Sequence, residues 1–179
     1  MSTVTAIILA RNEEKHIVDC IKSIQFADEI LVIDDGSTDQ TVPLATNLGA
    51  KVISHPLNGD WSQQRRFSIS QAHCEWILFI DSDERVSPQL AKSIQESIKG
   101  EPKAYWLRRY NLFHHNPATH GVVRPDKVLR LMPREGATVE GAVHETFISP
   151  YPQATLEGLI NTLQQRLTST RNKGNLVVF

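Results

Sequence analysis

The sequence has little cysteine and no long apolar run, and both absences exclude classes of protein. Its two cysteines, Cys20 and Cys74, lie in apolar-patterned segments without Cys-x-x-Cys spacing or a histidine at metal-ligand spacing. We therefore expect core thiols in a reducing compartment, and neither a disulfide framework nor a zinc site. The longest uninterrupted apolar runs, 6–10 and 76–80, have five residues each, and no signal-peptide pattern opens the chain. These features predict a cytoplasmic protein that is not secreted and does not span a bilayer.

An excess of charge of one sign is also missing, because 19 Lys and Arg stand against 20 Asp and Glu. This balance argues against a nucleic-acid binder. The charges are nevertheless sorted: residues 1–90 carry 7 basic and 13 acidic side chains, and residues 91–179 carry 12 and 7. Between 103 and 134, seven Lys or Arg face a single acid, Asp126. This stretch is either an ordinary solvated surface, or a site for an anionic acceptor or for peripheral contact with an anionic membrane at the inner face of the cell.

The pattern of the first hundred residues predicts an α/β fold. A length of 179 residues with 40% hydrophobic and 22% charged side chains is typical of one globular domain. Short apolar runs at 4–10, 30–33, 52–53 and 76–80 alternate with helical patterns. Such alternation predicts βαβ units in a mainly parallel, Rossmann-like sheet. Asn12 is expected to cap the first helix, and Ser87 followed by Pro88 to begin the fourth.

The second half has a different, α+β character. Residues 105–113, 128–132 and 143–148 are expected to be strands separated by loops. A final helix is predicted from the apolar residues Leu156, Leu159, Ile160, Leu163 and Leu167.

Two acidic clusters follow expected strands. Asp81 and Asp83 come directly after the apolar run 76–80, and Asp34 and Asp35 end the second strand. Ligands of open α/β sheets bind beyond the carboxyl ends of the strands, so these acids are expected in one cleft. Two carboxylates one residue apart can hold Mg or Mn if phosphate or water completes the shell, although an ordinary acidic turn is the alternative. For Asp34, a turn that caps the following helix is an equal alternative, and for Asp39 such a turn is the favoured interpretation.

Other candidate residues have structural alternatives of their own. Trp61 and Trp106 can flank a sugar ring, but core packing is the favoured interpretation of both. His144 is interpreted first as a structural histidine, and Arg130 is also consistent with a solvated face.

Three segments in a fixed order carry a resemblance to a known family. They are Arg11–Glu14 after the first strand, Val32–Thr41 at the end of the second, and Glu75–Glu84 around the fourth. Together they resemble a family 2 glycosyltransferase with the GT-A fold over residues 3–148. The segments 59–65, 124–130 and 143–145 are similar to the subgroup that adds glucose to the inner core of bacterial lipooligosaccharide.

The resemblance implies a role for each matching position. Asp35, with Asp34 beside it, would contact the uracil or ribose of a nucleoside-diphosphate sugar. Asp81 and Asp83 would face the ribose and the divalent metal that bridges the diphosphate, aided by Arg65 or Arg130. Glu145 would be the general base of an inverting transfer to a saccharide or glycolipid acceptor.

The chain departs from the family pattern after Glu145, since members usually continue further on the acceptor side. We therefore expect a nucleotide-sugar-binding domain at 1–150 and a C-terminal helix and tail at 151–179 with a truncated acceptor side. A nucleotide-sugar-binding protein without turnover is one alternative. An aspartate-nucleophile phosphatase is another, although its second acidic pair should lie downstream of Asp81. A sugar nucleotidyltransferase needs a Gly-rich loop after the first strand, and Leu9–Asn12 contains no glycine.

Overall fold

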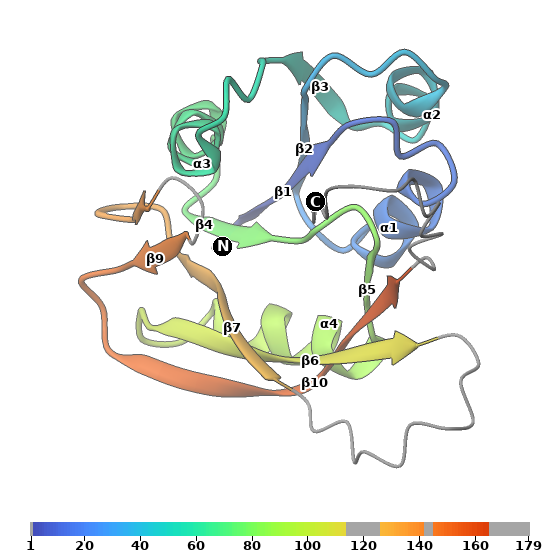
Figure 1. Cartoon of the computed structure of the whole chain (residues 1–179). Helices are drawn as coiled ribbons and strands as arrows, with labels where there is room; N and C mark the ends of the chain where they lie inside the picture. The colour runs from blue at the N-terminus through green and yellow to red at the C-terminus, as the bar shows by residue number, and fades with distance from the viewer. Residues whose placement is uncertain (1, 114–125, 142–144, 165–179) are drawn as a thin grey trace, which may run out of the picture.

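A mixed eight-stranded sheet organises the chain (Figure 1). The computed structural model describes residues 2–113, 126–141 and 145–164. Its helices are α1 (Ile17–Ser23), α2 (Thr41–Asn47), α3 (Trp61–Gln71) and α4 (Pro88–Ser97). Its strands are β1 (Val4–Ala10), β2 (Glu29–Asp34), β3 (Lys51–Ser54), β4 (Trp76–Phe79), β5 (Glu84–Val86), β6 (Ala104–Phe113), β7 (Asp126–Pro133), β8 (Thr138–Glu140), β9 (Thr146–Ile148) and β10 (Gln153–Gln164). None of the helices within these ranges is both long and apolar enough to cross a bilayer.

Most strands of the sheet run in one direction. The strand order is β3-β2-β1-β4-β7-β6-β10-β5. Pairing is parallel between β1 and both of its neighbours, between β2 and β3, and between β6 and β10. In this sheet β7 and β5 run against their neighbours, and β8 pairs with β9 in a separate antiparallel ribbon. The mainly parallel α/β sheet with a strand-rich C-terminal part confirms the fold class expected from the sequence.

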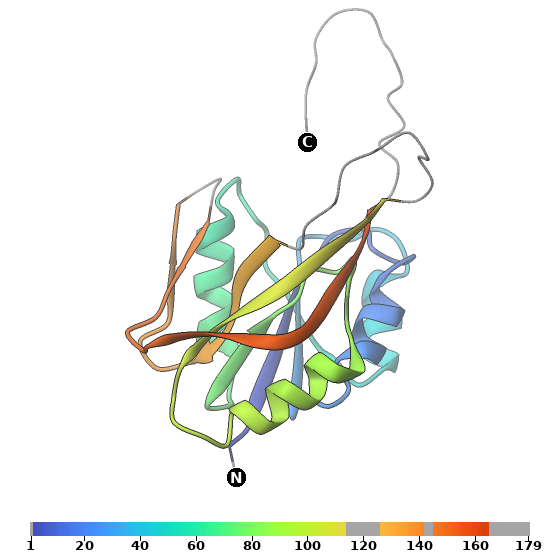
Figure 2. The same ribbon diagram turned by 90° about the horizontal axis from the view of Figure 1, so that it is seen from below.

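Two apolar layers cover the two faces of the sheet. On one face, α1, α2 and α4 bury residues such as Ile21, Ala45 and Leu90. On the other face, α3 and the β8–β9 ribbon contribute Ile69 and Val139. Figure 1 shows α3 and β9 on the side opposite α1 and α2, and Figure 2 shows α4 lying along β10. All residues of β1 and β4 are buried, as expected for strands covered on both faces.

The carboxyl ends of the central strands meet at one edge of the sheet. Ala10 at the end of β1 is in register with Asp34 at the end of β2. On the other side of β1, the Ile80 N–H after β4 donates to the Ile7 carbonyl at 3.0 Å. The two acidic clusters therefore follow strands that flank β1, which is the position where α/β sheets bind ligands.

The prediction of a helix over 156–167 is wrong, because Gln153–Gln164 is strand β10. Leu156 and Ile160 stand at helical spacing, but they also stand at even spacing with Ala154 and Thr162. These four residues pack into or border the core. The two-residue period and the parallel pairing with β6 therefore decided the structure of this segment. The residues from 165 onward lie outside the described part of the chain.

The helix starts were predicted with mixed success. Ser87 caps α4 as expected, since its Oγ accepts from the Leu90 N–H at 3.2 Å and Pro88 occupies the first turn. The prediction that Asn12 caps α1 is wrong. Asn12 has a φ of 56° and its Oδ1 accepts from the Thr38 N–H at 2.8 Å, so it ties the loop after β1 to the loop after β2.

Candidate active site

The two acids at the end of β2 have different roles. Asp34 is buried and accepts hydrogen bonds from the Gly36 N–H at 3.0 Å and the Ser37 N–H at 3.1 Å. Gly36 has a φ of 73°, which glycine adopts without strain, so Asp34 closes the turn after the strand. The carboxylate of Asp35 lies outside this turn, where it accepts from the Leu57 N–H at 2.7 Å and pairs with Arg11 at 3.1 Å.

A pocket of about 330 Å³ lies over the strand ends. Asp35 and Asp81 both line it, so each acidic cluster contributes one carboxylate to the same cleft, whereas Asp34 and Asp83 are not among its lining residues. The remaining lining includes the apolar residues Leu9, Ala10, Leu57 and Trp61 and the cations Arg11 and Arg65. Trp61 is 42% exposed, so the favoured interpretation of this residue as core is wrong. The pocket thus combines an apolar floor with carboxylate acceptors at its edge, a combination that suits a heterocyclic base.

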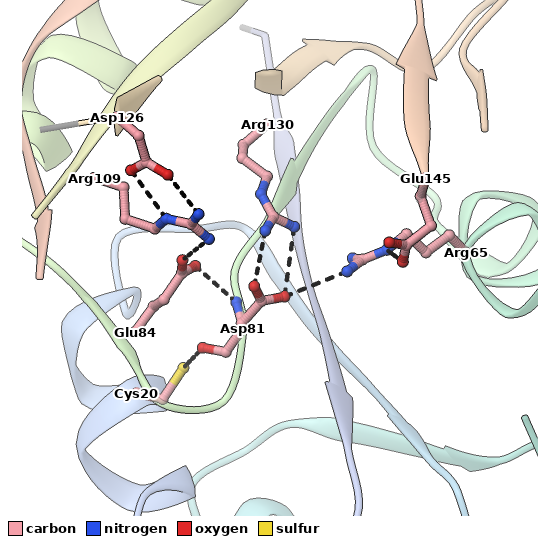
Figure 3. Close-up of polar contacts among 8 residues, drawn as sticks. All are labelled: Cys20, Arg65, Asp81, Glu84, Arg109, Asp126, Arg130 and Glu145. Atoms are coloured by element: carbon pink, nitrogen blue, oxygen red, sulfur yellow. Dashed lines mark hydrogen bonds and ion pairs between the residues drawn. The ribbon is translucent and has the colours of Figure 1, made fainter. Parts of the chain in front are cut away.

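Asp81 is the centre of a charged network (Figure 3). Its Oδ2 lies 2.7 Å from Arg130 Nη2, and its Oδ1 lies 3.4 Å from Arg65 Nη2. Burial acts to raise the pKa of this carboxyl, but the guanidinium groups of Arg130 and then Arg65 outweigh it and hold the pKa below its ordinary value. Asp81 is therefore an ionised group whose orientation is set by two arginines that the sequence had assigned to the donor site.

Asp83 has the chemistry of a metal ligand without completing a site. Burial, followed by the negative charge of Asp81, raises the pKa of its carboxyl. It makes no ion pair with any described residue and does not line the pocket, although its neighbours Asp81 and Ser82 do. The described residues contain no cluster of three groups able to hold a metal ion. Two carboxylates in a locally acidic turn fit a hard divalent cation that takes its other ligands from phosphate and water.

Arg65 connects the pocket to a second carboxylate. Its Nε donates to Glu145 Oε1 at 2.9 Å, while its Nη2 reaches Asp81 (Figure 3). The Arg65 side chain is 8% exposed, and its guanidinium lies 5.4 Å from the Phe79 ring centroid and 5.3 Å from that of Phe147. Arg65 comes from α3, Asp81 follows β4 and Glu145 precedes β9. The structure therefore brings together Arg65, Asp81, Arg130 and Glu145 from four separate segments.

Two members of the network were missed by the sequence analysis. Glu84 is fully buried; its Oε2 accepts from the Asp81 N–H at 2.9 Å, and its Oε1 lies 3.7 Å from Arg109. Arg109 in turn pairs with Asp126 at 2.6 Å. The position of Glu84 directly after Asp83 could have pointed to it, but the sequence of an acidic turn does not indicate which of its acids is buried. His144 and Arg124 lie outside the described residues.

A mainly parallel sheet with acids at the ends of the two strands that flank β1, and a pocket over those ends, characterises an α/β domain with a GT-A-like fold. The chain belongs to glycosyl transferase family 2, whose sequence model matches residues 5–164. This membership is incompatible with the phosphatase and nucleotidyltransferase alternatives.

Similar proteins agree with the assignment. An uncharacterized glycosyltransferase of Rickettsia prowazekii (strain Madrid E) is 38% identical over 151 residues, which cover 82% of this chain and 51% of the relative. The lipopolysaccharide core biosynthesis glycosyltransferase LpsC of Rhizobium meliloti (strain 1021) is 31% identical over 99 residues, 52% of this chain and 36% of the relative. The chain spans about half the length of the first curated relatives it matches, 51% in one of them.

Solved structures show the same fold. Glucosyl-3-phosphoglycerate synthase from Mycobacterium tuberculosis, in complex with Mn²⁺, UDP and glucosyl-3-phosphoglycerate, has a TM-score of 0.60 and 20% identity. The match covers 93% of this chain and 74% of that one. The first 349 residues of TarS from S. aureus have a TM-score of 0.58 and 19% identity, over 74% of this chain and 47% of that one.

Proposed function

We propose that the chain is the donor-binding and catalytic part of an inverting, metal-dependent glycosyltransferase. It transfers a sugar, glucose being the first expectation, from a UDP-sugar to a saccharide or glycolipid acceptor of the cell envelope. The observation that carries the proposal is the position of Arg65 between Asp81 in the pocket and Glu145 outside it. One guanidinium thus joins a donor-side carboxylate to a candidate base.

The donor assignment is supported by the pocket and by the neighbours. Asp35 can accept a hydrogen bond from the uracil N–H or a ribose hydroxyl, while Leu9 and Trp61 pack against the base. Glucosyl-3-phosphoglycerate synthase has been solved with UDP, and TarS with UDP-GlcNAc. The acceptor in lipopolysaccharide is supported by the partial likeness to LpsC, and the lipooligosaccharide subgroup by the segments quoted above.

Each residue of the network has a task in the proposed transfer. Arg130 and Arg65 orient Asp81 and place positive charge beside the departing diphosphate. Asp81 and Asp83 would hold the divalent metal, which when bound offsets diphosphate charge. Glu145 takes the proton of the acceptor hydroxyl as its oxygen attacks the anomeric carbon. The bond to the diphosphate breaks, and its electron pair leaves with the diphosphate.

The test is an assay of UDP release from a panel of UDP-sugars with Mn, with and without a saccharide acceptor. Asp35→Asn should weaken donor binding about 10- to 100-fold, the range for a hydrogen bond to a charged group. Asp19→Asn, on the exposed side of α1, is the matched control and should bind donor like the parent. Donor binding with neither hydrolysis nor transfer would identify the protein as a nucleotide-sugar-binding protein without turnover.

A further inference from the structure

A second groove of about 350 Å³ lies next to the donor pocket, and Arg65 lines both. Glu145, Trp106 and Phe147 line the groove together with Lys127 and Arg130. The groove therefore receives residues from α3, β6, β7, β9 and the segment that leads into β9. Glu145, the candidate base, lines the groove and pairs with Arg65, so it lies near the boundary between the groove and the donor pocket.

The walls of the groove include two aromatic side chains with fixed orientations. Trp106 is half-buried, and its Nε1 donates to Gln153 Oε1 at 2.9 Å, which holds the indole in place. Phe147 packs on Phe79 with ring centroids 4.8 Å apart. A fixed aromatic face that is partly open to solvent can pack against the apolar CH face of a sugar ring.

The charge of the groove is one-sided. Arg65, Arg109, Lys127 and Arg130 line it, and Glu145 is the acid among its described lining residues. The three arginines already pair with acids, whereas Lys127 is exposed and makes no ion pair within the described ranges.

A second unpaired cation stands beside Lys127. In the antiparallel pairing of β6 with β7, Arg108 lies directly opposite Lys127, and it too is exposed and without an ion pair to a described residue. Arg108 is not among the residues that line the groove, but it is two residues from Trp106, so both side chains lie on the same face of β6. Like charges directly opposite each other destabilise a sheet, and an anion bound by both would offset their repulsion. This pair is a second observation, independent of the groove, that points to an anionic ligand.

We propose that the groove is the acceptor subsite and that its occupant is a saccharide carrying a carboxylate or phosphate group. Trp106 packs on the sugar ring, Lys127 and Arg108 bind the acid group, and Glu145 faces the hydroxyl that reacts. The inference rests on the proposed function and names the acceptor class for the same site. A concave groove with Trp106 and Phe147 in its walls favours a sugar over a flat membrane surface.

The experiment measures binding to the full chain at low salt by ligand-observed NMR, without donor. The probes are methyl β-D-glucuronide, glucose 6-phosphate and the neutral methyl β-D-glucoside. Both acidic sugars should bind about two- to tenfold more tightly than the glucoside, because each exposed ion pair contributes little. Lys127→Gln combined with Arg108→Gln should remove this preference and leave binding of the glucoside unchanged. Lys51→Gln, on the opposite edge strand β3, is the matched control and should keep the preference.

Several outcomes would overturn the proposal. They are equal affinity for acidic and neutral sugars, no binding of any probe, and a preference that survives the double substitution. Binding to vesicles rich in anionic lipid, with the sugars inert, would assign the two cations to a membrane surface instead. The assay needs neither donor nor turnover, so its failure is distinguishable from the failure of UDP-sugar transfer.

Discussion

The guanidinium of Arg65 is shared between two carboxylates that lie far apart in sequence. Its Nε is 2.9 Å from Glu145 and its Nη2 is 3.4 Å from Asp81. Because the bond to Glu145 is the shorter one, Arg65 mainly orients the candidate base, with one carboxylate oxygen held and the other left for the acceptor. A donor that draws Asp81 toward its ribose or metal would leave this orientation in place.

Glu145→Gln tests the base directly. The amide keeps the size of the side chain and faces away from the donor pocket, so affinity for UDP-sugar should stay within about twofold of the parent. Transfer should fall about 10²- to 10⁴-fold, the usual loss when acid-base assistance is removed. Steady-state rates and donor titrations of the same preparation separate the two quantities. Glu140→Gln, exposed at the end of β8, is the control, and a Glu145→Gln variant that transfers at the parent rate would remove Glu145 from the mechanism.

Glu84 predicts a specific dependence of stability on pH. Burial, followed by the charge of Asp81, raises the pKa of its carboxyl from 4.5 to about 7. The folded state therefore keeps a proton that the unfolded state loses, so this contribution to stability is full below about pH 4.5 and is lost as the pH rises to 7. Glu84→Gln cannot ionise, and its stability relative to the parent should rise by about 1 to 3 kcal/mol between pH 4.5 and 7.5.

Urea unfolding at a series of pH values measures this difference. Glu96→Gln is the control, since the Glu96 side chain on α4 is 65% exposed and should follow the parent at every pH. Parallel curves for Glu84→Gln and the parent would show that Glu84 does not titrate in this range.

The acids at the ends of β2 and β4 could be predicted from the sequence because each ends or follows a recognisable strand, whereas Arg65, Arg130 and Glu145 were assigned through the resemblance to the family. The pairings between them could not, since Arg65 and Glu145 are 80 residues apart and meet only through tertiary packing. The different roles of Asp34 and Asp35 could not be predicted either. Both are acids in one turn, and only the folded backbone shows that Asp34 closes the turn.

At the scale of elements, β10 shows where local pattern and tertiary structure disagree. The strands of the first half were predictable because runs buried on both faces, such as β1 and β4, are apolar without interruption. In β10 the same apolar residues fit both a helix and a strand, and a bulge adds residues between Thr155 and Leu159. Pairing with β6 decides in favour of the strand. This pairing places Gln153 beside Ala104, which lies 49 residues earlier in the chain.

A substitution of Gly158, which lies in this bulge, should show how much the packing of β10 against α4 contributes to stability. It has a φ of 100°, and a Cβ there would lie 2.5 Å from the backbone N and 2.6 Å from the Cα of Leu90 at the start of α4. Gly158→Ala should therefore lower the free energy of unfolding by about 2 kcal/mol or more, because β10 or α4 must shift from its packed position to relieve the contact. Denaturant unfolding measures the change. Gly100→Ala is the control, with its nearest contact at 3.6 Å, and a similar small effect of both would mean that β10 does not lie tightly on α4.

Across the whole molecule, the acidic first half and the basic second half of the sequence are joined by ion pairs. The first half is acidic and the second basic, and the ion pairs of the site join them: Asp81 with Arg130, and Glu84 with Arg109. Arg65 with Glu145 joins the halves in the opposite sense. The basic stretch 103–134 is thus partly built into the site, and Lys127 and Arg108 are the two of its exposed cations that we propose bind a ligand.

The melting temperature of the protein should show whether UDP binding depends on a metal. A ligand that binds only the native state stabilises it by about 2.7 kcal/mol at a concentration of 100 Kd, or about 5 to 10 °C for a domain of this size. UDP with Mn should give such a rise in Tm, and UDP in chelator a clearly smaller one, because diphosphate charge then faces the acidic turn unscreened. Asp83→Ala should reduce the rise with Mn to that in chelator, since one carboxylate holds the cation poorly. Asp19→Ala is the control on the exposed side of α1, and an equal rise in Mn and in chelator for the parent chain would rule out the metal at Asp83.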